Sequence, residues 1–342
     1  MHGLIENEAQ LEELLSQPSK EVVDAVVRLD GDFLLLGIAG KIGPGLARMI
    51  KRACEEANSS RRIIGVSRFS DQKLKDELEA EGFEIIRGDM LDQAFIQSLP
   101  KVKNVIFLAG MKFGSEENLS MTWAVNSFLP AMVAEHFSES RIVAFSTGCV
   151  YELVPVESGG SLETDLPGPV GEYAQSCLGR ERMFEYGSKK YHTEVAIIRL
   201  NYAVELRYGV LVDIALKVWN SEAVDLTMGF FNVIWQGEVN QMTIRSLEFC
   251  ESPARMINVT GEQTLSVKEV ARQFGELFGK EVKCTGTEAT NALLSNAQES
   301  FSLFGKPGTS VEQMMLWIAH WIKSGQRNLN KPTHFEVRDG KY

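Results

Sequence analysis

Three regularly spaced glycines, Gly37, Gly40 and Gly43, form the part of the chain best suited to hold a nucleotide. They follow the apolar run 33–36 and open a helical stretch that starts at Pro44. In such a strand–turn–helix the first glycine allows a tight turn, the second lets backbone approach a pyrophosphate, and the third lets the helix pack on the strand. The unpaired N–H groups of the helix N-terminus then face the phosphates. A glycine turn without a ligand is the alternative interpretation.

Polar residues suited to the adenosine half of a dinucleotide follow the next two expected strands. The second strand ends at Ser67 and Arg68 without a carboxylate, and an arginine there accommodates a 2′-phosphate, which slightly favours NADP(H) over NAD(H). The alternative is that Arg68 is an ordinary surface charge and the cofactor is NAD(H). The third strand ends at Asp89 and Met90, where a carboxylate can accept from the adenine amine, cap a helix starting near Leu91, or do both.

A small-residue turn completes the predicted cofactor site. Leu108, Ala109 and Gly110 end the fourth expected strand, where a small side chain lets the cofactor backbone pass closely. Lys41 and Ile42 lie inside the glycine turn itself and are included in the predicted site.

Alternating short apolar runs and helical patterns must position these residues. The expected strands, several of them apolar at every position, are 33–37, 62–67, 83–87, 104–109, 141–146 and 194–200. The expected helices between them are 44–57, 71–81, 91–98, 118–138 and 173–188. This alternation predicts an α/β fold with a Rossmann-type, doubly wound parallel sheet.

The pattern divides the chain into four expected parts. They are an N-terminal helical extension (1–30), a Rossmann dinucleotide-binding domain (31–202), a smaller C-terminal α/β substrate-binding lobe (203–325) and a polar tail (326–342). The lobe is expected to contain the short strands 224–228, 256–260 and 281–285. We expect the tail to lie on the surface or fray.

Composition limits the functional classes. The 342 residues carry a formal net charge of −11, which argues against nucleic-acid binding and against binding to anionic membrane surfaces. We expect no signal peptide and no membrane span. The five cysteines are scattered without metal-ligand spacing, so we expect reduced thiols, no metal site and a cytoplasmic location.

Taken in chain order, a series of short motifs resembles the extended short-chain dehydrogenase/reductase family, the NAD-dependent epimerase/dehydratase enzymes that act on sugars. The matching residues are Gly37-x-x-Gly40-x-x-Gly43, Asp89, Leu108-Ala109-Gly110, Asn126, the run Ser146 to Tyr151, Tyr173, Arg199-Leu200-Asn201 and the run Asn258 to Gly261. The resemblance implies a Rossmann domain with a smaller substrate lobe. It also implies a homodimer formed by the helix after the fourth strand and the helix that carries Tyr173.

The resemblance assigns catalysis to two residues. In the family a tyrosine exchanges a proton with a substrate hydroxyl or carbonyl while hydride moves to or from the nicotinamide. Tyr173 matches that tyrosine, and Thr147 matches the hydroxyl that orients the substrate oxygen, with Ser146 beside it. A free tyrosine has a pKa of about 10 and is a poor base near neutrality. The family therefore uses a lysine four residues later to lower that pKa and to hold the nicotinamide ribose.

This chain has Cys177 in place of that lysine. A thiol carries no positive charge and is too short to span two ribose hydroxyls. Three interpretations stay open. Another cation, either Arg180, Arg182 or Lys112, compensates; or the protein is a reductase whose neutral Tyr173 phenol donates a proton; or the protein binds nucleotide without turnover.

Two further residues are implied by the same resemblance. Cys149 lies where some family epimerases carry a catalytic cysteine, although a half-buried structural thiol is the alternative. Asn201 is expected on the substrate side of the cleft, whereas Trp235 fits the core of the second lobe slightly better.

The predicted function is an NAD(P)-dependent oxidoreductase or epimerase that acts on a carbohydrate-like small molecule: a sugar, sugar acid, polyol or ketone. The second lobe lacks the cluster of Arg and Lys expected of a nucleotide-diphosphate site. The rival hypothesis is a non-catalytic dinucleotide-binding protein that senses redox state or supports a partner.

Overall fold

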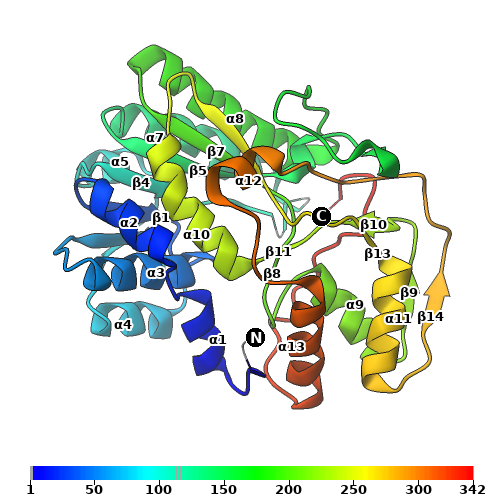
Figure 1. Ribbon diagram of the computed structural model, residues 1–342. Coiled ribbons are helices and arrows are strands. Elements are labelled where there is room, and N and C mark those ends of the chain that lie inside the picture. Colours follow the sequence, from blue (N-terminus) through cyan, green and yellow to red (C-terminus); the bar gives the residue numbers. More distant parts are fainter. Residues whose placement is uncertain (1–2, 113, 116, 342) are drawn as a thin grey trace.

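The computed structural model describes residues 3–112, 114–115 and 117–341. A seven-stranded parallel sheet occupies one half of the molecule, and a smaller lobe of helices and two-stranded sheets occupies the other (Figure 1). In spatial order the strands are β12 (Arg255–Val259), β7 (Val195–Leu200), β5 (Arg141–Thr147), β4 (Asn104–Phe107), β1 (Phe33–Leu36), β2 (Ile63–Ser67) and β3 (Glu84–Arg87). This order confirms the predicted doubly wound α/β fold.

Both faces of the sheet are covered, which explains why its central strands are apolar at every position. Phe33 and Leu35 face one layer of core side chains, and Leu34 and Leu36 face the other. The first layer contains α2 (Lys20–Arg28), α3 (Gly43–Glu56), α4 (Gln72–Ala80) and α10 (Gln236–Ser246). The second contains α5 (Gln93–Ser98), α7 (Leu129–His136) and α8 (Gly171–Tyr191).

The last strand of the sheet departs from the prediction. We expected residues 256–260 in the second lobe, but β12 pairs in parallel with β7, with Ile257 opposite Ile198. The helix α10 before it packs against α3 and α2, so the chain returns to the main sheet after its first excursion into the smaller lobe.

The helix expected over 118–138 is interrupted. It consists of α6 (Leu119–Trp123), a π-helical turn (Ala124–Phe128) and α7. Pro130 has no N–H to donate to Asn126, and Leu129 N–H reaches back to the Ala124 carbonyl instead. The wider turn places Asn126 inside the protein, close to the end of β4.

The smaller lobe is built mainly from helices around one core. Its helices are α9 (Val210–Trp219), α11 (Val267–Phe278) and α13 (Val311–Lys323), while α12 (Gln298–Phe304) lies beside β12. Its strand pairs are β8–β11 (Ala203–Val204, Ile234–Trp235), β9–β14 (Ala223–Asp225, Lys283–Thr285), β10–β13 (Phe230–Phe231, Leu265–Ser266) and β6–β15 (Val154–Pro155, Asn291–Ala292). Trp235 packs in this core with Trp317, as expected.

The N-terminal helices fasten the two halves together. Helix α1 (Glu8–Leu15) contributes Leu11 and Leu15 to the core of the smaller lobe, whereas α2 contributes Val22 and Val26 to the first layer over the main sheet. Among the described residues, no helix has the length and apolar character that a membrane span requires.

Of the two courses expected for the tail, it lies along the surface and does not fray. Phe335 is buried against Phe231, with ring centroids 6.1 Å apart, and Arg338 donates to the carbonyl oxygens of Thr227 and Asn291. The segment therefore packs along β10 rather than fraying, because its few apolar side chains enter a preformed core (Figure 1).

Candidate active site

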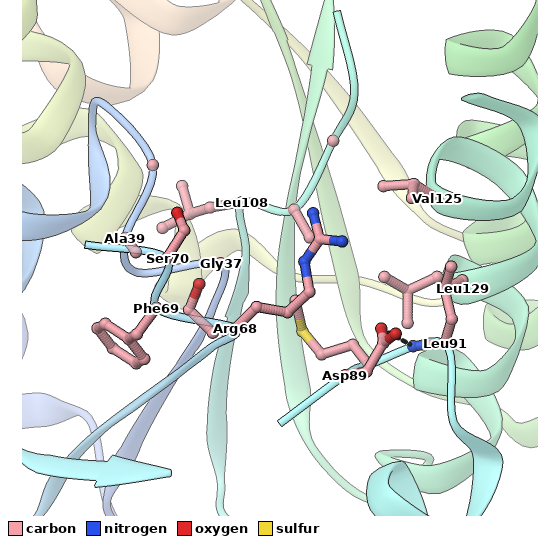
Figure 2. A pocket seen from close by; sticks show the side chains of 15 residues that line it. Gly37, Ala39, Arg68, Phe69, Ser70, Asp89, Leu91, Leu108, Val125 and Leu129 are labelled. Atoms are coloured by element: carbon pink, nitrogen blue, oxygen red, sulfur yellow. Dashed lines mark hydrogen bonds between the residues drawn. The ribbon is translucent and has the colours of Figure 1, made fainter. Parts of the chain in front are cut away.

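A cavity of about 590 Å³, called here the first cavity, opens at the carboxyl ends of β1, β2 and β4 (Figure 2). In open α/β sheets ligands bind at this edge, where the strand order reverses. Its lining includes most of the predicted cofactor residues, namely Gly37, Gly40, Ser67, Arg68, Asp89, Met90, Leu108, Ala109 and Gly110.

The glycine turn leaves no room for side chains. Gly37 has a φ of +94°, and a Cβ there would lie 2.8 Å from the Ala109 nitrogen. A Cβ on Gly43 would lie 2.1 Å from the Ile38 carbonyl oxygen, so the start of α3 lies directly against the turn. The N-terminal N–H groups of α3 thus face the groove, which suits a pyrophosphate. This cradle fits a dinucleotide.

The residues at the ends of β2 and β3 shape the far side of the first cavity. Arg68 is exposed and extends its guanidinium across the cavity mouth, while the Phe69 ring turns away (Figure 2). The Arg68 carbonyl accepts a hydrogen bond from Arg87 Nε at 3.1 Å, which fixes the backbone of this turn. Ser67 lines the same cavity.

Asp89 does not cap the following helix. Its carboxylate accepts from the Leu91 N–H at 3.0 Å, but Asp92 is the N-cap of α5 and accepts from the Ala94 N–H. The alternative in which Asp89 serves as the cap is therefore wrong. Asp89 closes a local turn with one carboxylate oxygen and faces the cavity (Figure 2).

A second cavity of about 400 Å³ continues the groove. It shares Gly40, Leu108 and Gly110 with the first cavity and adds Tyr173 and Ser146. Lys41, Ile42 and Gly43 of the glycine turn also line it. The glycine turn and Tyr173, far apart in sequence, thus border one continuous groove.

Burial keeps the Tyr173 phenol neutral. It raises the pKa of Tyr173 well above its usual value, and the neighbouring thiols of Cys177 and Cys149 raise it further. Arg180 opposes this shift without overcoming it. Burial likewise raises the pKa of Cys177, which is fully enclosed among Val150, Tyr151 and Tyr173. Tyr173 is therefore suited to donate a proton rather than to accept one.

The three cations that the sequence analysis considered as partners for Tyr173 differ in position. Arg182 is at the surface and pairs with Glu185 at 2.6 Å, so it takes no part in the site. Lys112 donates to the Thr333 carbonyl at 2.9 Å, and its ammonium lies 5.9 Å from the centre of the Tyr173 ring.

Arg180 is buried beneath the turn that contains Gly110. Its guanidinium donates to the Phe145 carbonyl at 2.8 Å and to Asn126 Oδ1 at 2.6 Å. Asn126 in turn holds both backbone polar groups of Met111. Arg180 thus fixes the loop after β4, and its positive charge lies near Tyr173 as a consequence.

The two hydroxyls after β5 have different surroundings. Ser146 lines the second cavity and donates to Glu181 Oε1 at 2.6 Å, which leaves its oxygen lone pairs available. Thr147 Oγ1 accepts from the Cys149 N–H at 3.2 Å. The residues that line the second cavity do not include Thr147, Cys149, Cys177 or Asn201.

Cys149 and Asn201 lie on the side of the smaller lobe. Cys149 is nine-tenths buried and packs with Ala174 and Leu293. Asn201 donates to Asn232 Oδ1 at 2.7 Å and packs against Gly148. Both residues are close to the Tyr173 end of the groove.

A buried ionic network behind Ser146 was missed by the sequence analysis. Arg199 and Glu181 form a salt bridge at 2.8 Å, with side chains 3% and 0% exposed. Arg199 also donates to the Tyr151 hydroxyl, which donates to Asn258 Oδ1. Burial by itself lowers the pKa of Arg199, but the hydrogen bond and charge of Glu181 outweigh it and raise the pKa. The network fixes the ends of β5, β7 and β12 together.

Neither a protein-family model nor a curated protein sequence matches this chain. Solved structures share its fold. MoeE5 in complex with UDP-glucose and NAD is 18% identical with a TM-score of 0.70 over 86% of this chain and 99% of that one. UDP-glucuronic acid 4-epimerase from Bacillus cereus, in complex with NAD, is 17% identical with a TM-score of 0.71 over 86% and 100%. UDP-glucose 4-epimerase from Thermotoga maritima is 15% identical with a TM-score of 0.69 over 86% and 99%.

These likenesses show a fold shared with NAD-dependent nucleotide-sugar epimerases and dehydratases, that is, a Rossmann-like sheet with a smaller C-terminal lobe. MoeE5 and the Bacillus cereus epimerase are both described in complex with NAD, so these structures give no support to the expected preference for NADP.

Proposed function

We propose that this protein is an NAD(P)-dependent oxidoreductase that reduces a carbonyl of a carbohydrate-derived small molecule. The observation that carries the proposal is the continuous groove that joins the glycine turn to Tyr173. Gly37, Gly40 and Gly43 would hold the pyrophosphate, and Arg68 and Asp89 would contact the adenosine half. A nicotinamide dinucleotide bound there supplies or accepts the hydride.

The residues of this chain account for the other half of the reaction. In this proposal the neutral Tyr173 phenol donates a proton to the carbonyl oxygen, and Ser146, which lines the same cavity, and Thr147, which follows it in sequence, orient that oxygen. Reduction needs no tyrosinate, so it tolerates the replacement of the family lysine by Cys177. Oxidation of an alcohol, including the first half of an epimerisation, requires a base and is disfavoured by the raised pKa of Tyr173.

The first test is titration of the protein with NADPH, NADP⁺, NADH and NAD⁺, followed by a turnover panel of sugars and sugar acids. Tyr173→Phe should abolish turnover and leave dinucleotide affinity within about twofold, since loss of a general acid costs about 10²–10⁴ in rate. Tyr186→Phe, an exposed tyrosine on the same helix, is the matched control. Failure of all four dinucleotides to bind would overturn the proposal.

A catalytically impaired dinucleotide-binding protein is the second candidate. The observation that favours it is the enclosed pairing of Tyr173 with the uncharged Cys177. Tight dinucleotide binding together with equal, negligible turnover in wild type and Tyr173→Phe would support this candidate over the first.

We also propose a homodimer formed through α6 to α8. Large apolar side chains gather on these helices, with Phe128 58% and Trp123 38% exposed. Sedimentation should show a dimer for wild type and a monomer for Phe128→Glu. Leu316→Glu, on α13 of the smaller lobe, is the control and should remain dimeric.

A further inference from the structure

The second cavity is lined by several basic side chains in a chain that is acidic as a whole. Lys41, Lys112, Lys331 and Arg180 line it, and none of the described lining residues is an Asp or Glu. The whole sequence has 46 acidic residues against 35 Lys and Arg, so chance placement would favour the opposite sign. Converging positive charges in a concave site attract an anionic ligand and raise its local concentration.

The lysines come from three separate segments. Lys41 lies in the glycine turn, Lys112 in the loop after β4, and Lys331 in the tail. Three separate segments of the chain thus bring basic side chains to one cavity, where each positive charge disfavours the charged form of the others.

The tail is fixed in position. The Thr333 carbonyl accepts from Lys112 Nζ at 2.9 Å, and the Asp213 carboxylate accepts from both the N–H and the hydroxyl of Thr333, at 2.8 and 2.6 Å. Further along, Gly340 lies so close to the start of α8 that a Cβ on it would be 2.3 Å from the Val170 carbonyl oxygen. Lys331 thus enters the cavity from an anchored segment that ends beside the helix of Tyr173.

The charges act on one another. The pKa of Lys41 is lowered to about 7, mainly by burial and further by the charges of Lys112 and Lys331, while Glu205 and Asp213 oppose the shift. The Lys41 ammonium also lies 3.1 Å from the centre of the Tyr208 ring. Burial lowers the pKa of Lys112 in the same direction. Neighbouring cations thus contribute to the shift of Lys41, whereas the shift of Lys112 comes from burial.

We propose that Lys41, Lys112 and Lys331 form a site for the carboxylate or phosphate group of an acidic substrate, held next to Tyr173. The inference rests on the proposed function for the statement that the anion belongs to the substrate. The same cations could instead meet a phosphate of the dinucleotide, and the experiment separates these two sources. Of the carbohydrate classes, the site therefore selects sugar acids and sugar phosphates over neutral sugars.

The test is calorimetric titration of the protein, with and without saturating NAD⁺, using D-glucuronate, D-glucose and inorganic phosphate as probes. Glucuronate and glucose differ in having a carboxylate or a CH₂OH group at one carbon. Glucuronate and phosphate should bind saturably, and glucuronate should bind at least about tenfold more tightly than glucose, as expected for charge-assisted hydrogen bonds.

Variants identify the residues responsible. Lys331→Gln should weaken binding of glucuronate and phosphate by about five- to tenfold and leave NAD⁺ and NADP⁺ affinity unchanged. Lys341→Gln, which changes an exposed lysine of the same tail, should change neither anion affinity nor dinucleotide affinity.

Proton uptake on anion binding is a second readout. An anion favours protonated Lys41, so near pH 7 to 8 binding should take up protons, and Lys41→Gln should remove that uptake.

Three results would overturn the proposal. They are no saturable binding of either anion, equal affinity for glucuronate and glucose, or a loss of dinucleotide affinity in Lys331→Gln as large as its loss of anion affinity. The last result would assign the lysines to the cofactor. Anion binding is also measured without dinucleotide. The experiment can therefore reject the anion site without rejecting dinucleotide binding, and it can reject dinucleotide binding without rejecting the anion site.

Discussion

The first and second cavities lie along one groove, yet they differ in charge and in the parts of the chain that build them. The first is lined by residues between Gly37 and Leu129, all from the half that contains the main sheet, and carries one charge of each sign, Arg68 and Asp89. The second adds Tyr173, the tail residue Lys331 and an excess of cations. The first therefore has features that any dinucleotide requires, while the second carries the features particular to this chain.

The two cavities also differ in how their walls are supported. The first depends on close backbone packing at the glycine turn, where a single methyl group does not fit. The second is supported by the buried salt bridge between Glu181 and Arg199, which reaches it through Ser146. Substitutions in the glycine turn should therefore mainly weaken dinucleotide binding, and substitutions in the Glu181–Arg199 pair should mainly lower the free energy of unfolding.

The largest expected effect comes from breaking that salt bridge. Glu181→Gln leaves the Arg199 charge buried without its partner and should lower the free energy of unfolding by about 3–5 kcal/mol. Denaturant unfolding measures the loss. Arg182→Ala, which removes the exposed Arg182–Glu185 pair on the same helix, should cost no more than about 1 kcal/mol. If the two variants lost similar amounts of unfolding free energy, the buried salt bridge would not be the main support of the second cavity.

The next effect concerns the glycine turn. Gly43→Ala forces a Cβ against the Ile38 carbonyl and should destabilise the protein by about 1–3 kcal/mol while weakening binding of every dinucleotide. Gly45→Ala lies on the same helix, where the nearest atom to a new Cβ is Asn240 Nδ2 at 3.4 Å. It should be neutral or stabilising by up to about 1 kcal/mol, because alanine favours a helix. Unchanged dinucleotide affinity in Gly43→Ala would separate the turn from cofactor binding.

A smaller effect should follow from charge beside Tyr173. With the pKa of Tyr173 raised, wild type at saturating substrate should reduce it at a rate nearly independent of pH between about pH 6 and 9, while the reverse oxidation should rise with pH throughout that range. Cys177→Lys should lower the pKa of Tyr173, and each unit gives about tenfold more tyrosinate and faster oxidation near pH 8. Cys177→Met has similar length without charge. If both variants change the pH profile alike, packing rather than charge is responsible.

The smallest effect concerns the choice of cofactor. Arg68→Ala should weaken NADP⁺ binding by about fivefold relative to NAD⁺, since an exposed guanidinium contributes about 1 kcal/mol to a phosphate contact. Arg62→Ala, before the other end of the same strand, is the control and should leave the ratio unchanged. An unchanged ratio in Arg68→Ala would show that Arg68 is an ordinary surface charge.

The features that could be predicted from sequence are those carried by local pattern. The strand–turn–helix at Gly37, Gly40 and Gly43 and the fully apolar central strands each follow from neighbouring residues, and the structure contains both. The strand β12 was misplaced because its neighbour in space, β7, lies far away in sequence and the chain visits the smaller lobe between them.

The charges of the second cavity could not be predicted for the same reason. Lys331 was part of a tail expected to lie on the surface or fray, and the packing of Thr333 and Phe335 brings it to the cavity that Tyr173 lines. Lys41 was noted merely as part of the glycine turn. The Glu181–Arg199 pair could have been found from one signal in the sequence, because each of these charged residues lies in a segment whose pattern predicts burial. The roles of Thr147, Tyr173, Cys149 and Asn201 stay predictions.

The anchored tail also affects the order in which the two cavities form during co-translational folding. The strands and turn around the first cavity are all synthesised once β12 has been made, and domains generally form as their residues emerge from the ribosome. The second cavity must wait for Lys331 and for the contacts of Thr333 and Arg338 that anchor it. A nascent chain halted before these residues would have a cradle for nucleotide without the wall that we assign to an acidic substrate.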